Sequence, residues 1–173
     1  MVYYCGSRPE EKREEWRAFL RTADRYLASA NENLENYHEV SEYLAKHSVE
    51  CAFKAVLSKY GKLTEDLRKG EKGHNLLLLK QRIIEDKCLP KSVFDVKTRR
   101  LIERVSHIDH PSPQSPNEEP LIDCVTSQIS KTRYPINGYS PDEYVNKEDA
   151  RKTLEDCCEL IHILKSAISI QNL

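Results

Sequence analysis

The strongest constraint on the fold is a pair of long segments, one near each end of the chain, whose apolar residues recur with the period of an α-helix. The first segment predicts a helix from about Glu10 to Glu35. The last predicts a helix that follows Asn146, a favourable N-cap residue. Each stripe is expected to pack one face of its helix against a core. The two stripes comprise Trp16, Phe19, Leu20, Ala23, Tyr26, Leu27, Ala30 and Leu34, and Ala150, Leu154, Cys157, Ile161, Leu164 and Ile168.

Between these segments the sequence predicts further helices. One runs from about Tyr37 to Tyr60 and is ended by Gly61, a residue suited to the position after a helix. Another begins near Asn75, a plausible N-cap. A further helix is expected to start at Ser92 and to close at the proline that follows His110, because the residue before a proline leaves the α region.

Two longer connections separate the predicted helices. The stretch 61–73 is charged and punctuated by glycine, and it predicts a surface loop. The stretch 111–130 contains four prolines and is the longest predicted loop. With only five glycines in 173 residues, an all-β fold with many turns is not expected. We expect an all-α, up-and-down bundle of four or five helices, with a long proline-containing loop before the last helix. It forms one domain over residues 1–173, with its core at about 16–168.

Composition narrows the class of protein. The formal net charge is −1, so no global basic field points to nucleic acid. No stretch approaches the roughly 18 apolar residues of a membrane span, and the first residues lack the apolar core of a secretion signal. The six cysteines include no C-x-x-C pair, which predicts no metal site and favours reduced, mostly buried thiols. We therefore expect a cytoplasmic protein.

Four polar residues near the second and third predicted helices are candidates for a site. Glu50 and Lys54 stand four residues apart, and this spacing is typical of a solvated helix pair, but neighbouring small residues allow another helix to approach. His47 lies on an apolar stripe, where a histidine is more often a core residue than a ligand or base. His74 follows Gly73 at a helix start, where it either caps the helix or contacts an anion.

Arg133 is the strongest candidate for anion contact. A guanidinium forms bidentate hydrogen bonds with phosphate, and the adjacent Tyr134 offers a ring on which a base can stack. The simpler alternative is a loop arginine that binds a backbone carbonyl.

Two histidine–arginine spacings resemble those of metal-independent RNA cleavage. Arg104 with His110 forms R-x5-H, and Arg100 with His107 forms R-x6-H. In such pairs histidine moves the proton of the 2′-hydroxyl and arginine stabilises the phosphorane charge. The alternative is a charged helix C-terminus, where cations are favoured by the helix dipole. Neither of the familiar glycine-rich phosphate loops is present.

Taken in order, three segments resemble the HEPN domain (higher eukaryotes and prokaryotes nucleotide-binding). They are HSVECAFKAVLSKYG, GHNLLLL and TRYP, the last preceding the final helix. The resemblance spans about Trp16 to Ile168. It implies an up-and-down helical bundle that is commonly dimeric. Members of the family bind nucleotides, partner with minimal nucleotidyltransferases, or act as metal-independent ribonucleases in toxin–antitoxin and defence systems.

By position, the resemblance implies that Glu50 and Lys54 correspond to the charged pair of the family's second helix. His74 corresponds to the histidine that opens its third helix, and Arg133 and Tyr134 to its R-Y-P segment. Ribonuclease members carry R-x4–6-H near the start of the last helix. In this chain no histidine lies at that reach after Arg133, because residues 138–140 are Gly-Tyr-Ser.

The resemblance therefore favours a non-catalytic binding module. It implies a homodimer that holds a nucleotide (ATP or another NTP) or RNA with the residues just named, without a required cofactor. A minimal nucleotidyltransferase is the implied protein partner. The first alternative is a metal-independent endoribonuclease that uses Arg104 and His110. The second is a structural helical adaptor without a ligand.

Overall fold

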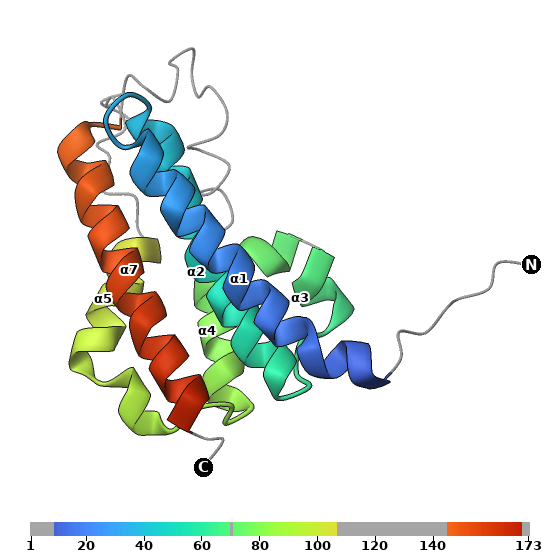
Figure 1. Cartoon of the computed structure of the whole chain (residues 1–173). Coiled ribbons are helices and arrows are strands. Elements are labelled where there is room, and N and C mark those ends of the chain that lie inside the picture. The colour runs from blue at the N-terminus through green and yellow to red at the C-terminus, as the bar shows by residue number, and fades with distance from the viewer. Residues whose placement is uncertain (1–8, 70, 107–144, 171–173) are drawn as a thin grey trace, which may run out of the picture.

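The computed structural model describes residues 9–69, 71–106 and 145–170 (Figure 1). Within these ranges the chain forms helices and no strand, which confirms the predicted all-α bundle. The predicted proline-containing loop at 111–130 lies outside the described residues. The α-helices are α1 (Pro9–Asn33), α2 (His38–Lys59), α3 (Glu65–Lys69), α4 (Leu76–Glu85), α5 (Val96–Ser106) and α7 (Lys147–Ile170), and the 3-10 helices are η1 (Glu71–His74) and η2 (Lys91–Phe94).

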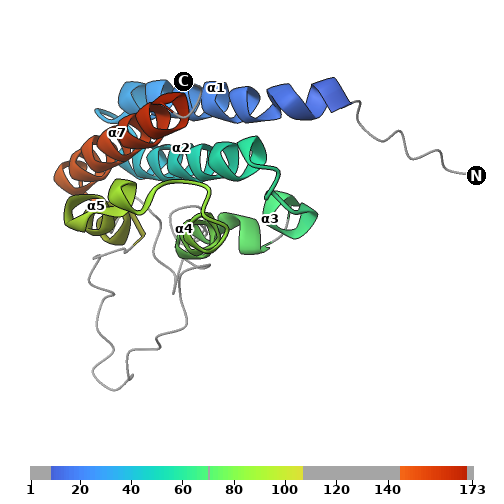
Figure 2. The ribbon, with the colours of Figure 1, turned by 90° about the horizontal axis from the view of Figure 1, so that it is seen from below.

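Helix α2 is the centre of the bundle. Figure 2 shows it between a layer formed by α1 and α7 and a second layer formed by α4 and α5, and α2 packs against α1, α7 and α4. A helix that is covered on several sides needs apolar residues around its whole circumference. The sequence of α2 meets this need with fully buried Val49, Ala52, Phe53, Ala55, Val56 and Leu57.

The predicted helix ends are confirmed at three positions. Gly61 follows α2 with φ of +67°, in the left-handed region that glycine adopts without strain. The amides of Gly61 and Lys62 donate to the carbonyls of Ser58 and Leu57, which closes the helix. At the N-termini of α4 and α7 the side-chain oxygens of Asn75 and Asn146 accept hydrogen bonds from backbone amides three residues later.

Two sequence predictions were wrong. The stretch 61–73 is not a simple loop, because it contains α3 and most of η1, and Leu67 within it is buried. Ser92 does not begin a long helix. It lies in η2, and α5 starts only after Asp95, whose carboxylate accepts a hydrogen bond from the amide of Thr98 at 2.8 Å. At 91–94 a short 3-10 turn stands where the sequence predicts the first turn of a longer α-helix.

Of the helices described, none combines the length and the apolar character that crossing a membrane requires.

Candidate functional site

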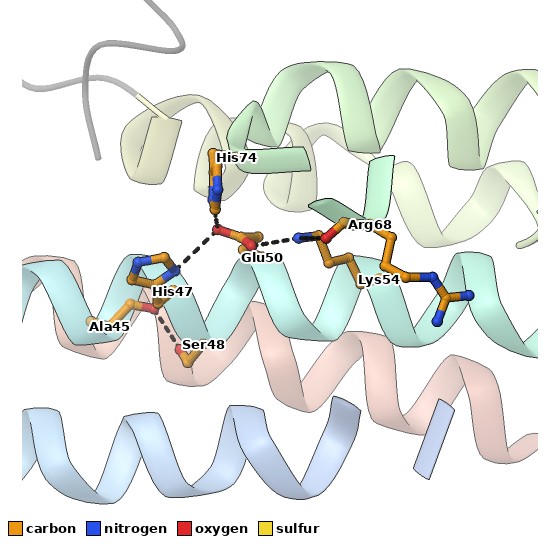
Figure 3. Close-up of polar contacts among 7 residues, drawn as sticks. All are labelled: Ala45, His47, Ser48, Glu50, Lys54, Arg68 and His74. Atoms are coloured by element: carbon orange, nitrogen blue, oxygen red, sulfur yellow. Dashed lines mark hydrogen bonds and ion pairs between the residues drawn. The ribbon is translucent and has the colours of Figure 1, made fainter. Parts of the chain in front are cut away.

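A buried carboxylate on α2 gathers three cationic or imidazole side chains (Figure 3). Oε1 of Glu50 accepts a hydrogen bond from Nζ of Lys54 at 2.7 Å. Oε2 lies 3.0 Å from Nδ1 of His74 and 3.1 Å from Nδ1 of His47. Glu50 is only 4% exposed, so its charge is compensated almost entirely by these neighbours. The four side chains form one unit, which we call the Glu50 cluster.

Helix geometry brings three members of the Glu50 cluster together. His47, Glu50 and Lys54 are spaced by three and four residues, so they lie on the same face of α2. The fourth member, His74, is the last residue of η1, directly before Asn75 caps α4. The cap fixes where α4 begins, and His74 is thereby held over the face of α2 that carries Glu50.

The approach of η1 to α2 depends on Gly73. A Cβ atom at this position would lie 2.4 Å from the carbonyl oxygen of Leu67 and 3.2 Å from Nζ of Lys54. No side chain fits there without displacing the backbone of α3. Lys54 also donates to the carbonyl oxygen of Arg68 at 3.3 Å, which ties the end of α3 to the same cluster.

The electrostatics of the cluster keep Glu50 ionised. Burial by itself raises the pKa of the carboxyl group, but the hydrogen bond from His47 and the charge and hydrogen bond of Lys54 outweigh it and lower the pKa to about 2. An ionised carboxylate only accepts hydrogen bonds, so Nδ1 of His47 and Nδ1 of His74 both carry a hydrogen. This tautomer follows from the hydrogen-bond network.

The two histidines differ in their access to solvent. The side chain of His47 is 13% exposed and packs between Tyr26, stacked at 5.6 Å between ring centroids, and Tyr43, edge-on at 4.4 Å. The side chain of His74 is 47% exposed. The Glu50 cluster therefore extends from a buried carboxylate to the surface through His74, and it can orient an imidazole or hold a cation.

A second buried ion pair on α2 provides a contrast. Lys46 donates to Glu42 at 2.5 Å, and both residues are 2% exposed. Both Glu42 and Lys46 are more deeply buried than His74, which is 47% exposed. Buried pairs of this kind often contribute little net stability, because desolvation offsets their attraction.

The other predicted site residues do not join the Glu50 cluster within the described part of the chain. Arg104 donates to both carboxylate oxygens of Asp156, each at 2.6 Å, and this bidentate pair joins α5 to α7. The hydrogen bonds and charge of Asp156 raise the pKa of the Arg104 guanidinium. His110, Arg133 and Tyr134 lie outside the described residues.

His47 has a polar contact that its place on an apolar stripe does not predict. The residue is largely buried, as expected of a core histidine, but its Nδ1 also faces Oε2 of Glu50 at 3.1 Å. The signal that could have revealed it is the spacing of three residues between His47 and Glu50, which places both on one helix face. The absence of a C-x-x-C pair predicts no metal site, and only the fold brings His74 to His47 and Glu50. The described cysteines are thiols, of which Cys51, Cys88 and Cys157 are buried and Cys158 is exposed.

The sequence model of the HEPN domain family matches residues 16–167. No curated protein and no solved structure matches the chain.

Proposed function

The chain belongs to the HEPN domain family, and from this premise we propose that it is a binding module for a nucleotide or an RNA phosphate, with its ligand at the exposed edge of His74. HEPN domains generally bind nucleotides or act on RNA. The observation that carries the proposal is the continuous link from the buried carboxylate of Glu50 to the half-exposed ring of His74. Packing alone does not require such a link, because apolar residues fill a core at least as favourably as buried ions.

The members of the Glu50 cluster have different roles in this proposal. Lys54 is buried and already bound to Glu50 and to the carbonyl of Arg68, so it acts by holding Glu50 in place. Glu50 in turn orients His74. With the hydrogen on Nδ1, Nε2 of a neutral His74 is an acceptor. It therefore suits a ribose hydroxyl or a base N–H.

The phosphate requires a different partner, because an acceptor nitrogen repels it. Helix α4 begins directly after His74 and Asn75, and the N-terminus of a helix favours anions. We propose that Arg133 adds bidentate hydrogen bonds to the phosphate and that Tyr134 stacks on the base. Both assignments rest on the resemblance of the TRYP segment to the family.

Thermal unfolding tests this proposal. The purified chain is melted with ATP, GTP, CTP, UTP and a short RNA, each with and without EDTA. A ligand at 100 times its dissociation constant adds about 2.7 kcal/mol of stability, which is a measurable rise in melting temperature. We expect a rise with at least one nucleotide or with RNA that is recovered intact. No rise with any of them would overturn the proposal.

Matched variants assign the residues. Arg133→Ala is compared with Arg151→Ala, an exposed arginine on α7. His74→Phe is compared with His162→Phe, because His162 is an exposed histidine that also lies on α7. We expect ligand-induced stabilisation to be lost in Arg133→Ala, reduced in His74→Phe and kept in both controls. Equal stabilisation in Arg133→Ala and the wild type would remove Arg133 from the site.

The same experiment distinguishes the ribonuclease alternative from the binding module. It requires Arg104 to exchange Asp156 for a phosphate and to act with His110. Cleaved RNA in EDTA with a 2′,3′-cyclic phosphate end, lost in His110→Ala, would favour this alternative. Cleavage that persists in His110→Ala would exclude the pair. Neither stabilisation nor cleavage would favour the structural adaptor.

The homodimer and the nucleotidyltransferase partner are also part of this proposal, in a toxin–antitoxin or defence-type system. They rest on family membership. Sedimentation velocity of the purified chain tests the dimer, and a single species of monomer mass across the accessible concentrations would contradict it. Co-expression with a minimal nucleotidyltransferase encoded beside the chain, followed by co-purification, tests the partner.

A further inference from the structure

We propose that Nδ1 of His47, Oε2 of Glu50 and Nδ1 of His74 form a binding site for one divalent transition-metal cation of the zinc class. The metal site shares Glu50 and His74 with the proposed nucleotide site, but its proposal rests on the three ligand atoms and not on nucleotide binding. It adds a metal ligand that the family match does not imply.

The positions of the three ligand atoms carry the proposal. One ligand atom from each of the three residues lies within 4.8 Å of the other two, and Oε2 lies 3.0 and 3.1 Å from the two Nδ1 atoms. Zinc binds imidazole nitrogen and carboxylate oxygen at about 2.0–2.2 Å, which separates tetrahedral ligands by roughly 3.3 Å. A spacing of 4.8 Å would have to shorten by about 1.5 Å for the three atoms to share one cation.

The donor types select the class of metal. Two imidazoles and one carboxylate are the ligands of zinc and of similar transition metals, whereas calcium and magnesium prefer sites built of oxygen atoms. Three protein ligands also leave a fourth position open for water or another ligand. The half-exposed side chain of His74 places that position near solvent.

The surroundings of the ligands suit a metal. Lys54 donates to Oε1, so it fixes the carboxylate while leaving Oε2 toward the histidines (Figure 3). Metal-ligating carboxylates are commonly hydrogen-bonded in this way. Tyr26 and Tyr43 pack against His47 and restrict the orientation of its ring.

When both histidines are neutral, a metal ion can bind without release or uptake of a proton. The cation takes the lone pair of each Nδ1, and the hydrogen of each ring moves to Nε2. Without a metal, the same three atoms are held by two hydrogen bonds to Oε2.

Cobalt(II) is the probe of choice. The full chain is treated with EDTA, freed of chelator and titrated with Co²⁺ at micromolar concentration without nucleotide, while visible absorption is followed. We expect the ligand-field bands of a tetrahedral ion, saturating at one equivalent and displaced by Zn²⁺. A thiolate-to-cobalt charge-transfer band should be absent. Its presence would assign the ion to a cysteine and overturn the proposal.

Three variants localise the ion. His74→Gln removes one ligand at a half-exposed position and keeps a donor for Glu50, so folding is expected to survive and is checked by circular dichroism. It should lose the cobalt spectrum, whereas His162→Gln and Cys158→Ser should keep it. No spectrum in the wild type, or an unchanged spectrum in His74→Gln, would overturn the proposal. Nucleotide binding is measured separately, so failure of one proposal leaves the other intact.

Discussion

Nδ1 of His74 lies 3.0 Å from Oε2 of Glu50, although the two residues are 24 positions apart and belong to different helices. Their contact joins the centre of α2 to the residue that precedes the N-cap of α4. The contact links a buried carboxylate to a side chain that is 47% exposed.

Replacement of Glu50 by glutamine should strongly destabilise the fold. The amide cannot neutralise Lys54, which would remain charged and buried beside α3. Loss of one partner of a buried ion pair typically reduces the free energy of unfolding by roughly 3–5 kcal/mol. Urea unfolding measures the change. Glu155→Gln, at an exposed position on α7, is the control and should shift stability by less than about 0.5 kcal/mol. Similar stability of the two variants would contradict the ion-pair account.

Replacement of Gly73 by alanine should disrupt the site. The added methyl group would meet the carbonyl oxygen of Leu67 at 2.4 Å, so η1 and His74 must move away from α2. Gly61→Ala is the matched control. It meets nothing within 4 Å but is strained by its φ of +67°, at a stability loss of about 1–2 kcal/mol. We expect both variants to lose stability and only Gly73→Ala to shift the NMR signals of His74 and His47. Unmoved histidine signals in Gly73→Ala would argue against the close approach.

Acid should destabilise the chain partly through Glu50. In the folded chain its pKa is about 2, below the ordinary value of 4.5. Between these values the unfolded chain binds a proton at Glu50 and the folded chain does not, so stability falls as the pH falls. The contribution of Glu50 is complete above pH 4.5 and is lost as the pH falls through about 2. Urea unfolding across this range in EDTA should show a shallower pH dependence in Glu50→Gln than in Glu155→Gln. Equal slopes would show that Glu50 titrates normally.

A ribose hydroxyl should strengthen nucleotide binding. As an acceptor, Nε2 of His74 favours a ligand that donates a hydrogen bond, and such a bond is worth about 1 kcal/mol, or roughly fivefold in affinity. Calorimetric titration with the nucleotide that stabilises the chain and with its 2′-deoxy and 3′-deoxy analogues measures the difference. We expect one analogue to bind more weakly in the wild type, and the difference to vanish in His74→Phe. A difference that survives in this variant would place the ribose elsewhere.

Much of the fold was predictable because helices are specified locally. The apolar stripes, the caps at Asn75 and Asn146 and the terminating Gly61 depend on residues within one or two turns. The wrong predictions lie where tertiary contacts determine the local secondary structure. Leu67 is buried, although its charged stretch of sequence predicts a surface loop. Asp95 occupies the cap position that the sequence predicts for Ser92.

The sequence by itself determined the helical architecture, the family and the placement of Glu50 and Lys54 on one face of α2. It could not determine whether that face meets solvent or another element, because the spacing of an ion pair is the same in both settings. Only the tertiary structure covered this face with α3 and η1, buried Glu50, and brought His74 to the same carboxylate oxygen as His47. The physical reason is that the site depends on a close approach across 24 residues, which Gly73 permits and no local periodicity encodes.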